Sequence, residues 1–324
     1  MTEPTEDRRL FREAADLAIR LQNDPANPVS AGMVRAWVAR SPKHQAVWGR
    51  VAEIHGMTGR ILTKQRKAAR HEASRHAAEG VSRRTLVLGG AIGLGVAALG
   101  TWATPRAILR AKAHYMTATA EVRRVALSDG SAITLGPDSA FALNLTDTRR
   151  SAELLSGMAF FEVASNPALP FAVHCGELTA TADGAAFDLS SDAGYISVSV
   201  NQGTVKTDAP RSQSGPAQQL NVGDWITLDV TSQRIARGTR EISQIATWRD
   251  GMIVAEQETV AAMVAKIARW QPGSVVLADR SLGSRLVSGV FDLHDPIRAL
   301  EAVVRPFGAN VRSITPFITI VSTV

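Results

Sequence analysis

The 324-residue sequence is long enough for two or three folded domains, and its 45% of hydrophobic residues can supply their cores. The single cysteine, Cys175, excludes a fold that is held together by internal disulfide bonds. The net charge of +6 arises before residue 85, because residues 1–84 contain 16 Lys/Arg and 9 Asp/Glu, whereas residues 105–324 contain 20 and 21. A nucleic-acid-binding domain usually carries a basic surface, so this distribution argues against direct binding of nucleic acid.

Residues 1–59 predict a small all-α domain of three helices. Residues 8–22 place apolar side chains at helical spacing, and Ser30 is a candidate N-cap for a second helix. Ser41 followed by Pro42 is typical of the start of a third helix.

Trp37, Trp48 and Val51 are the candidate contact residues of this helical domain. A domain of about 50 residues has a marginal core, so we expect the two tryptophans to contribute to it. The apolar helix surface that such a small core leaves over is available for docking another protein. The histidines of this region show no metal-ligand spacing, and we predict no metal site and no cofactor.

Residues 60–84 predict a basic helix that leads into an uncharged apolar segment, residues 85–104. Twenty helical residues span about 30 Å, the thickness of the hydrocarbon core of a bilayer. Eight Lys/Arg precede this segment closely and three follow it. Positive residues are retained on the cytoplasmic side, so we expect a single pass through a bacterial inner membrane with a cytoplasmic amino terminus and a periplasmic carboxyl terminus.

Other interpretations of residues 85–104 stay open. The segment is also compatible with a buried core helix, or with a signal peptide cleaved near residues 111–113. Arg83 and Arg84 precede a moderately apolar stretch, which resembles a twin-arginine export signal, although an arginine pair serves any inside anchor equally well.

After a linker at residues 105–119, residues 120–247 predict an all-β periplasmic domain. Apolar residues alternate with polar ones on both sides of a turn at residues 128–131, which is typical of a hairpin. About ten short strands follow, separated by turn residues, and separate strands are expected at residues 152–155 and 158–163.

Residues 248–324 predict a small α+β domain with the order β-α-β-β-α-β. Amphipathic helices are expected at residues 258–270 and 295–307, and strands at 309–314 and 317–323 close the chain. Asp295 followed by Pro296 is typical of an N-cap and the first helical turn.

A set of short motifs, taken together, resembles the FecR family of transmembrane sigma-factor regulators. Each motif alone is weak, but their order on both sides of a predicted membrane segment is specific. In chain order they are Trp37–Trp48, Leu127-x-Asp129-Gly130-Ser131, Arg150, Leu155-x-Gly157-x-x-Phe160-Phe161-x-Val163, Pro170-Phe171-x-Val173, Val198-x-Val200-x-x-Gly203-x-Val205, Leu220-x-x-Gly223-Asp224 and Trp248-x-x-Gly251. The last domain, with Val287, Gly289 and Phe291, is similar to the short domains of secretins and TonB-dependent receptors.

This resemblance implies a regulator that is not an enzyme. The head would hold an extracytoplasmic-function (ECF) sigma factor, through a surface that includes Trp37, Trp48 and Val51. The periplasmic part would bind the N-terminal signalling domain of a TonB-dependent outer-membrane receptor, with the region of Val287, Gly289 and Phe291 as the candidate contact. Regulatory proteases would then release the sigma factor, most often in iron uptake.

Gly184 and Ala185 mark a departure from the family pattern. Some members of the family cut themselves at a Gly-Thr bond, because a hydroxyl after the bond allows the acyl group to shift from nitrogen to oxygen. This sequence has Ala185 at the matching position, which carries no hydroxyl. We therefore expect no self-cleavage at this bond.

Two rival functions are each compatible with part of the sequence. A tethered periplasmic enzyme has only His174 and Cys175 as a suggestive pair, and neighbours on a strand point to opposite faces. A membrane-anchored periplasmic binding or envelope-structural protein is compatible with the β domain, but it leaves the helical head without a role.

Overall fold

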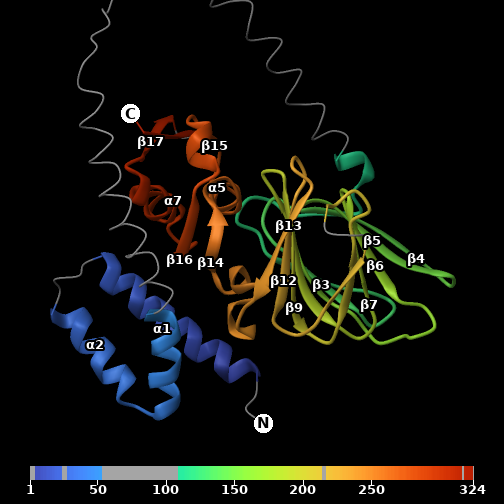
Figure 1. Ribbon diagram of the computed structural model, residues 1–324, viewed down its shortest axis with the longest axis horizontal. Helices are drawn as coiled ribbons and strands as arrows, with labels where there is room; N and C mark the ends of the chain where they lie inside the picture. The colour runs from blue at the N-terminus through green and yellow to red at the C-terminus, as the bar shows by residue number, and fades with distance from the viewer. Residues whose placement is uncertain (1–3, 24–27, 53–108, 214–216, 316, 324) are drawn as a thin grey trace, which may run out of the picture.

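The structure, a computed structural model, describes residues 4–23, 28–52, 109–213, 217–315 and 317–323. Figure 1 shows three parts, which we name the head (residues 4–52), the β body (115–239) and the C-terminal subdomain (252–322). The predicted basic helix and membrane segment, with Arg83 and Arg84, lie outside the described residues. Within the described ranges, no helix is both long and apolar enough to cross a membrane.

The head contains α1 (Pro4–Asn23), α2 (Pro28–Val38) and a helical stretch at residues 42–52. The second helix begins at Pro28 and not after Ser30, because proline is well suited to a first helical turn. The predicted cap of the third helix is confirmed, since the His44 amide donates to Ser41 Oγ at 3.3 Å.

The β body is a single 13-stranded sheet. Its strands are β1 (Tyr115–Met116), β2 (Arg123–Ala126), β3 (Ala132–Leu135), β4 (Ala140–Thr146), β5 (Arg149–Glu162), β6 (Phe171–Cys175), β7 (Leu178–Ala182), β8 (Ala186–Asp192), β9 (Tyr195–Gln202), β10 (Val205–Asp208), β11 (Ala217–Leu220), β12 (Asp224–Asp229) and β13 (Arg234–Thr239). The prediction of an all-β region is thus confirmed as a large β-rich domain.

Strand β5 connects the two halves of this sheet. Its first half pairs with β4 and, in parallel, with β6, whereas its second half pairs with β3 and β8. Gly157 lies between the halves at φ +96°, where a Cβ atom would come within 2.1 Å of Ser139 Oγ. The prediction of two strands here was wrong, because this glycine lets one strand bend without leaving the ladder.

Side chains from both halves of the sheet form one core. Phe171 and Val173 of β6 and Phe187 and Val198 of β8 and β9 belong to the same buried apolar cluster. The ring centroids of Phe161 and Phe187 are 5.1 Å apart in a stacked arrangement. The alternation of buried and exposed residues along β6 and β7 shows why a period of two could be recognised in the sequence.

The C-terminal subdomain follows the predicted order β-α-β-β-α-β and adds a short helix and a fifth strand. Two short 3-10 helices, η1 (Ile242–Gln244) and η2 (Thr247–Asp250), lead into it. Its elements are β14 (Met252–Thr259), α5 (Val260–Ala268), β15 (Ser274–Leu277), α6 (Arg280–Gly283), β16 (Leu286–Asp292), α7 (Pro296–Val304), η3 (Arg305–Phe307), β17 (Asn310–Thr315) and β18 (Ile318–Ser322). Strand β14 pairs with β16, and a separate sheet has the order β15-β18-β17.

The head packs against one face of the β14–β16 sheet. Met252, Val254 and Val290 from this sheet join the apolar cluster of the head. Ile253 and Phe291, which alternate with them, join the cluster formed with α5 and α7. The β14–β16 sheet is therefore covered on both faces, as Figure 1 shows, by the head on one side and by helices on the other.

Candidate interaction site

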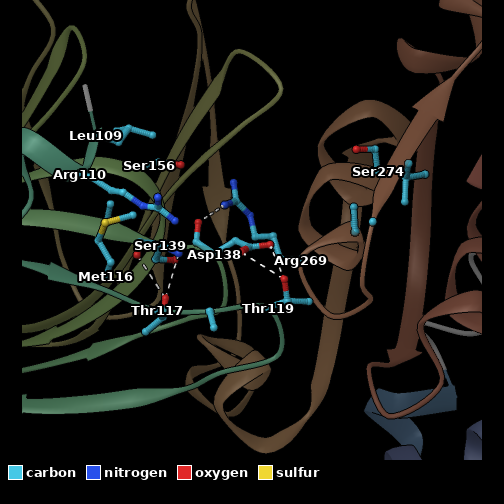
Figure 2. Close-up of a pocket in the computed structure, with 15 residues that line it drawn as sticks. Leu109, Arg110, Met116, Thr117, Thr119, Asp138, Ser139, Ser156, Arg269 and Ser274 are labelled. Carbon is cyan, nitrogen blue, oxygen red and sulfur yellow. Dashed lines mark hydrogen bonds between the residues drawn. The ribbon is translucent and has the colours of Figure 1, made fainter. Parts of the chain in front are cut away.

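A cleft of about 1020 Å³ lies where the C-terminal subdomain meets the β body. Its walls come from residues 109–119, from the turn that joins β3 and β4, and from the end of α5 with the start of β15. Figure 2 shows Arg269 facing Asp138 across this junction, with the Thr117 hydroxyl joined by hydrogen bonds to the backbone of Ser139 beside them. The cleft thus joins the segment that enters the β body with the subdomain that ends the chain.

Arg269 connects the C-terminal subdomain to the β body. Its guanidinium donates to Asp192 Oδ1 at 2.8 Å, to the Ser191 carbonyl at 3.0 Å and to the Asp138 carbonyl at 2.9 Å. The Asp192 side chain is only 1% exposed, so its charge depends on this contact for compensation. A largely buried arginine that donates to the end of β8 and to the β3–β4 turn fixes the orientation of the subdomain.

The entering segment is fixed at the same place. The Thr117 hydroxyl donates to the Gly136 carbonyl at 2.6 Å and accepts from the Ser139 amide at 2.9 Å. The Ala120 amide donates to the backbone carbonyl of Arg269 at 3.0 Å. The entering segment, the β3–β4 turn and the end of α5 therefore form one hydrogen-bonded unit.

A second group of charges lies deeper in the same interface. Lys266 of α5 contacts Glu258 of β14 at 2.6 Å. Burial alone would raise the pKa of Glu258, but the charges of Lys266 and Arg240 and the hydrogen bond from Lys266 together outweigh it, and the pKa is lowered. Trp248 Nε1 donates to Asp188 of β8 at 2.9 Å, and burial raises the pKa of that carboxyl despite this bond.

The motif residues Asp129 and Arg150 form a structural pair inside the β body. Arg150 Nε donates to Asp129 Oδ2 at 2.9 Å, and its Nη2 donates to the Ala164 carbonyl at the same distance. Burial would raise the pKa of Asp129, but hydrogen bonds from Ser131 and Arg150 together lower it. This pair explains why an Asp-Gly-Ser turn and a distant arginine occur together in the sequence.

The Gly184–Ala185 bond lies in the tight connection between β7 and β8. Gly184 has φ +64°, and Ala185 is 2% exposed with its carbonyl accepting from the Val163 amide at 2.8 Å. A pocket of about 580 Å³ opens beside it, with Arg124 and Arg249 among its lining residues. The bond therefore lies in a turn where Ala185 is buried and carries only a methyl group.

His174 and Cys175 do not form a site. Cys175 is 1% exposed and burial raises its pKa to about 12, so no thiolate is available near neutral pH. The His174 ring lies on the other face of β6, where Nδ1 meets Thr179 Oγ1 at 3.1 Å. The prediction that these neighbours point apart is confirmed.

The predicted contact residues of the head are mostly buried. Trp37 is 5% exposed and Val51 0%, whereas Trp48 is partly buried. The exposed apolar residues of the head lie on α2, where Val29 is 68% and Met33 44% exposed. The sequence does not reveal this pair, because apolar residues on a short helix show the same spacing whether their side chains are buried or exposed.

The predicted contact region of the C-terminal subdomain is also internal. Val287, Gly289 and Phe291 lie on β16, and the two apolar side chains are 2% and 3% exposed. Exposed apolar side chains are found instead at the β17–β18 hairpin, where Ile314 is 61% and Phe317 69% exposed. Strand β17 forms an edge of its sheet, so its outer backbone groups have no partner strand among the described residues.

Comparison with known proteins agrees with this architecture. Residues 113–206 match the family model described as FecR protein. Two crystal structures, both of a "putative anti-sigma factor" from Parabacteroides distasonis ATCC 8503, are similar with a TM-score of 0.58 at 20% sequence identity. Each match covers 65% of this chain and 98% of the other. No curated protein matches the chain.

The matched region extends from the entering segment to β10, and it contains the Asp129–Arg150 pair, the bend at Gly157 and the Gly184–Ala185 turn. It also contains the ordered motifs between Leu127 and Val205, whereas those at Trp37–Trp48, Leu220–Asp224 and Trp248–Gly251 lie outside it. The resemblance is therefore confirmed over residues 113–206, the part of the chain that matches the FecR family model.

Proposed function

We propose that this chain is a single-pass inner-membrane regulator in cell-surface signalling. Its head binds an ECF sigma factor in the cytoplasm, and its β body and C-terminal subdomain receive a signal from a TonB-dependent outer-membrane receptor in the periplasm. Proteases then release the sigma factor, and the regulated process is iron uptake.

One observation carries this proposal: a FecR region follows an uncharged 20-residue segment with eight Lys/Arg closely before it. The charge asymmetry supports a cytoplasmic head and a periplasmic body. The fold shared with crystal structures described as anti-sigma factors is consistent with a regulatory role.

Two surfaces suit the two partners. Val29 and Met33 give the head an exposed apolar patch on α2, which is suited to docking a helix of a sigma factor. Ile314 and Phe317 flank the open edge of β17, where a strand of the receptor domain can extend the β15-β18-β17 sheet. The buried residues of β16 then shape this subdomain without touching the receptor.

The first test is co-purification of the full chain, solubilised from membranes, with the ECF sigma factor encoded next to it. We expect stoichiometric recovery of the sigma factor, and we expect Met33→Lys to reduce it by about tenfold because a charge replaces an apolar contact. Arg20→Ala, on an exposed part of α1, is the matched control and is expected to leave recovery unchanged.

Failure of the wild-type chain to retain any sigma factor would contradict the proposed function. The rival reading, an anchored periplasmic binding protein, predicts that outcome together with retention of the chain on an envelope polysaccharide column. Equal loss in the Met33→Lys and Arg20→Ala chains would place the sigma factor elsewhere on the head.

A further inference from the structure

Hydrogen bonds and ion pairs join the head to the residues that lead into the C-terminal subdomain. Arg8 of α1 donates to Asp250 Oδ2 at 2.6 Å and to the backbone carbonyls of Ile245 and Ala246 at 3.2 and 2.8 Å. At the rim, Arg50 Nη1 lies 2.9 Å from a carboxylate oxygen of Glu241. Two arginines of the head thus meet two carboxylates that precede β14.

Residues of β14 supply most of the apolar part of the contact. Residues 252–255 are all buried, which is the pattern of a strand with both faces covered. Met252 and Val254 are each 5% exposed only because the head lies on them, together with Val290 of β16. Without the head, three apolar side chains and two carboxylates would form one continuous exposed surface.

The proposed membrane topology separates these two parts. Residues 1–84 lie in the cytoplasm and residues 105–324 in the periplasm, so Arg8 and Asp250 of one inserted chain face different compartments. The docked arrangement is compatible with that topology only before the membrane segment is inserted. A twin-arginine signal at Arg83 and Arg84 would fit this order of events, because that route carries folded proteins.

We propose that the outer face of the β14–β16 sheet is a docking surface for helix α1 of the same chain. The surface is occupied while the newly made chain is still in the cytoplasm, and it is vacated when export moves the body across the membrane. Docking covers apolar residues that would otherwise be exposed in the cytoplasm. This inference rests on the proposed single-pass topology for its timing, but not for the contact itself.

The test uses the full chain carrying Arg50→Cys and Glu241→Cys, synthesised in a cell-free system and treated with a short thiol-to-thiol cross-linker. One sample contains mild detergent and the other contains export-competent inner-membrane vesicles. Cys175 needs no replacement, because it is buried and its pKa is raised to about 12. We expect an intramolecular cross-link in detergent and its loss in chains whose body is protected inside the vesicles.

Charge variants identify the contact that the cross-link reports. Adding Arg8→Glu is expected to lower the yield in detergent at least about fivefold, and adding Asp250→Arg to that chain is expected to restore part of it. As a geometric control, Arg20→Cys replaces Arg50→Cys, because position 20 lies about 18 Å along α1 from Arg8. This pair is expected to give no cross-link.

Each outcome has one meaning. If no cross-link forms in detergent, the docking surface is wrong. If the cross-link joins two chains, the occupant of the surface is not α1 of the same chain. A cross-link that persists in chains with a protected body leaves docking intact and contradicts the proposed membrane topology. If Arg8→Glu leaves the cross-link yield in detergent unchanged, the polar contact does not determine docking.

Discussion

Ala185 matches the position at which, by the family resemblance, self-cleaving members carry a hydroxyl, and it follows Gly184 in the turn between β7 and β8. The wild-type chain is expected to remain intact, and Ala185→Thr is expected to yield two fragments that meet between residues 184 and 185. The hydroxyl accepts the acyl group of Gly184 as an ester and frees the amine of residue 185, and water then hydrolyses the ester to give the two fragments. Gly184 at φ +64° keeps the bond in the turn. The measurement is a denaturing gel of the purified chain with mass determination of both fragments.

Ala186→Thr is the control for this experiment, since it places a hydroxyl one residue too late. Fragments from the wild-type chain that meet at this bond would show that the hydroxyl is dispensable. The added methyl and hydroxyl groups enter a buried position, so the Ala185→Thr chain is also expected to lose about 1–3 kcal/mol of stability.

Arg269 provides a second prediction at the scale of single residues. Arg269→Ala leaves the 1%-exposed Asp192 without its cation, and it is expected to destabilise the chain by about 3–5 kcal/mol. Urea unfolding followed by tryptophan fluorescence measures the loss. Arg298→Ala removes an exposed pair with Asp295 and is expected to cost less than about 1 kcal/mol. Equal losses in both variants would contradict a special role for Arg269.

At the scale of elements, the packing of η2 against β8 makes stability depend on pH. Burial raises the pKa of Asp188 despite the bond from Trp248, so the folded chain favours the protonated carboxyl. This contribution is fully present below the unfolded pKa of about 3.9 and is lost as the pH rises through the folded pKa. Asp188→Asn keeps an acceptor for Trp248 and cannot ionise.

We therefore expect Asp188→Asn to raise the urea midpoint near pH 7 and to leave it almost unchanged near pH 3.5. The gain is small, because Asp188 keeps partial contact with solvent. Asp147→Asn, in an exposed turn, is the matched control. A lower midpoint for Asp188→Asn at pH 7 would mean that the carboxylate is needed by the neighbouring cations.

The edge strand β17 gives the prediction for receptor binding. Phe317→Lys is expected to weaken binding of the receptor's signalling domain by about tenfold, because a charge replaces an exposed apolar side chain beside the strand edge. Its stability is expected to change by less than about 0.5 kcal/mol. Isothermal titration with the signalling domain measures the affinity. Val222→Lys, at another exposed apolar position, is expected to bind normally, and a loss in that variant would move the contact to the β body.

The elements that could be predicted from the sequence depend on local chemistry. The strands of the β body follow from a period of two, and Asp295 with Pro296 begins α7 as predicted, with the Asp295 side chain accepting from the Arg298 amide. The continuity of β5 could not be predicted, because Gly157 in a sequence is more typical of a break than of a bend in one strand.

At the scale of the whole molecule, prediction failed wherever contacts join distant residues. Arg269 meets acceptors 77 and 131 positions away, and Arg8 meets Asp250 from 242 positions away. The spacing of apolar residues along the sequence holds no information about such contacts. The period of two predicted the β-rich domain and the family resemblance a regulatory role, but neither predicted that the head lies on the β14–β16 sheet.

Strand β1 has only two residues, and it forms the first ladder after residue 109. In a chain anchored ahead of that point, tension between the anchor and a bound receptor enters the β body at Tyr115 and Met116. These two residues pair with β4 at a single short ladder, which opens one rung at a time, whereas the 14-residue β5 must shear along most of its length. In the proposed topology, this two-residue ladder is the part of the β body nearest the membrane. Pulling would present an extended segment to a protease there while the remaining β body stays folded.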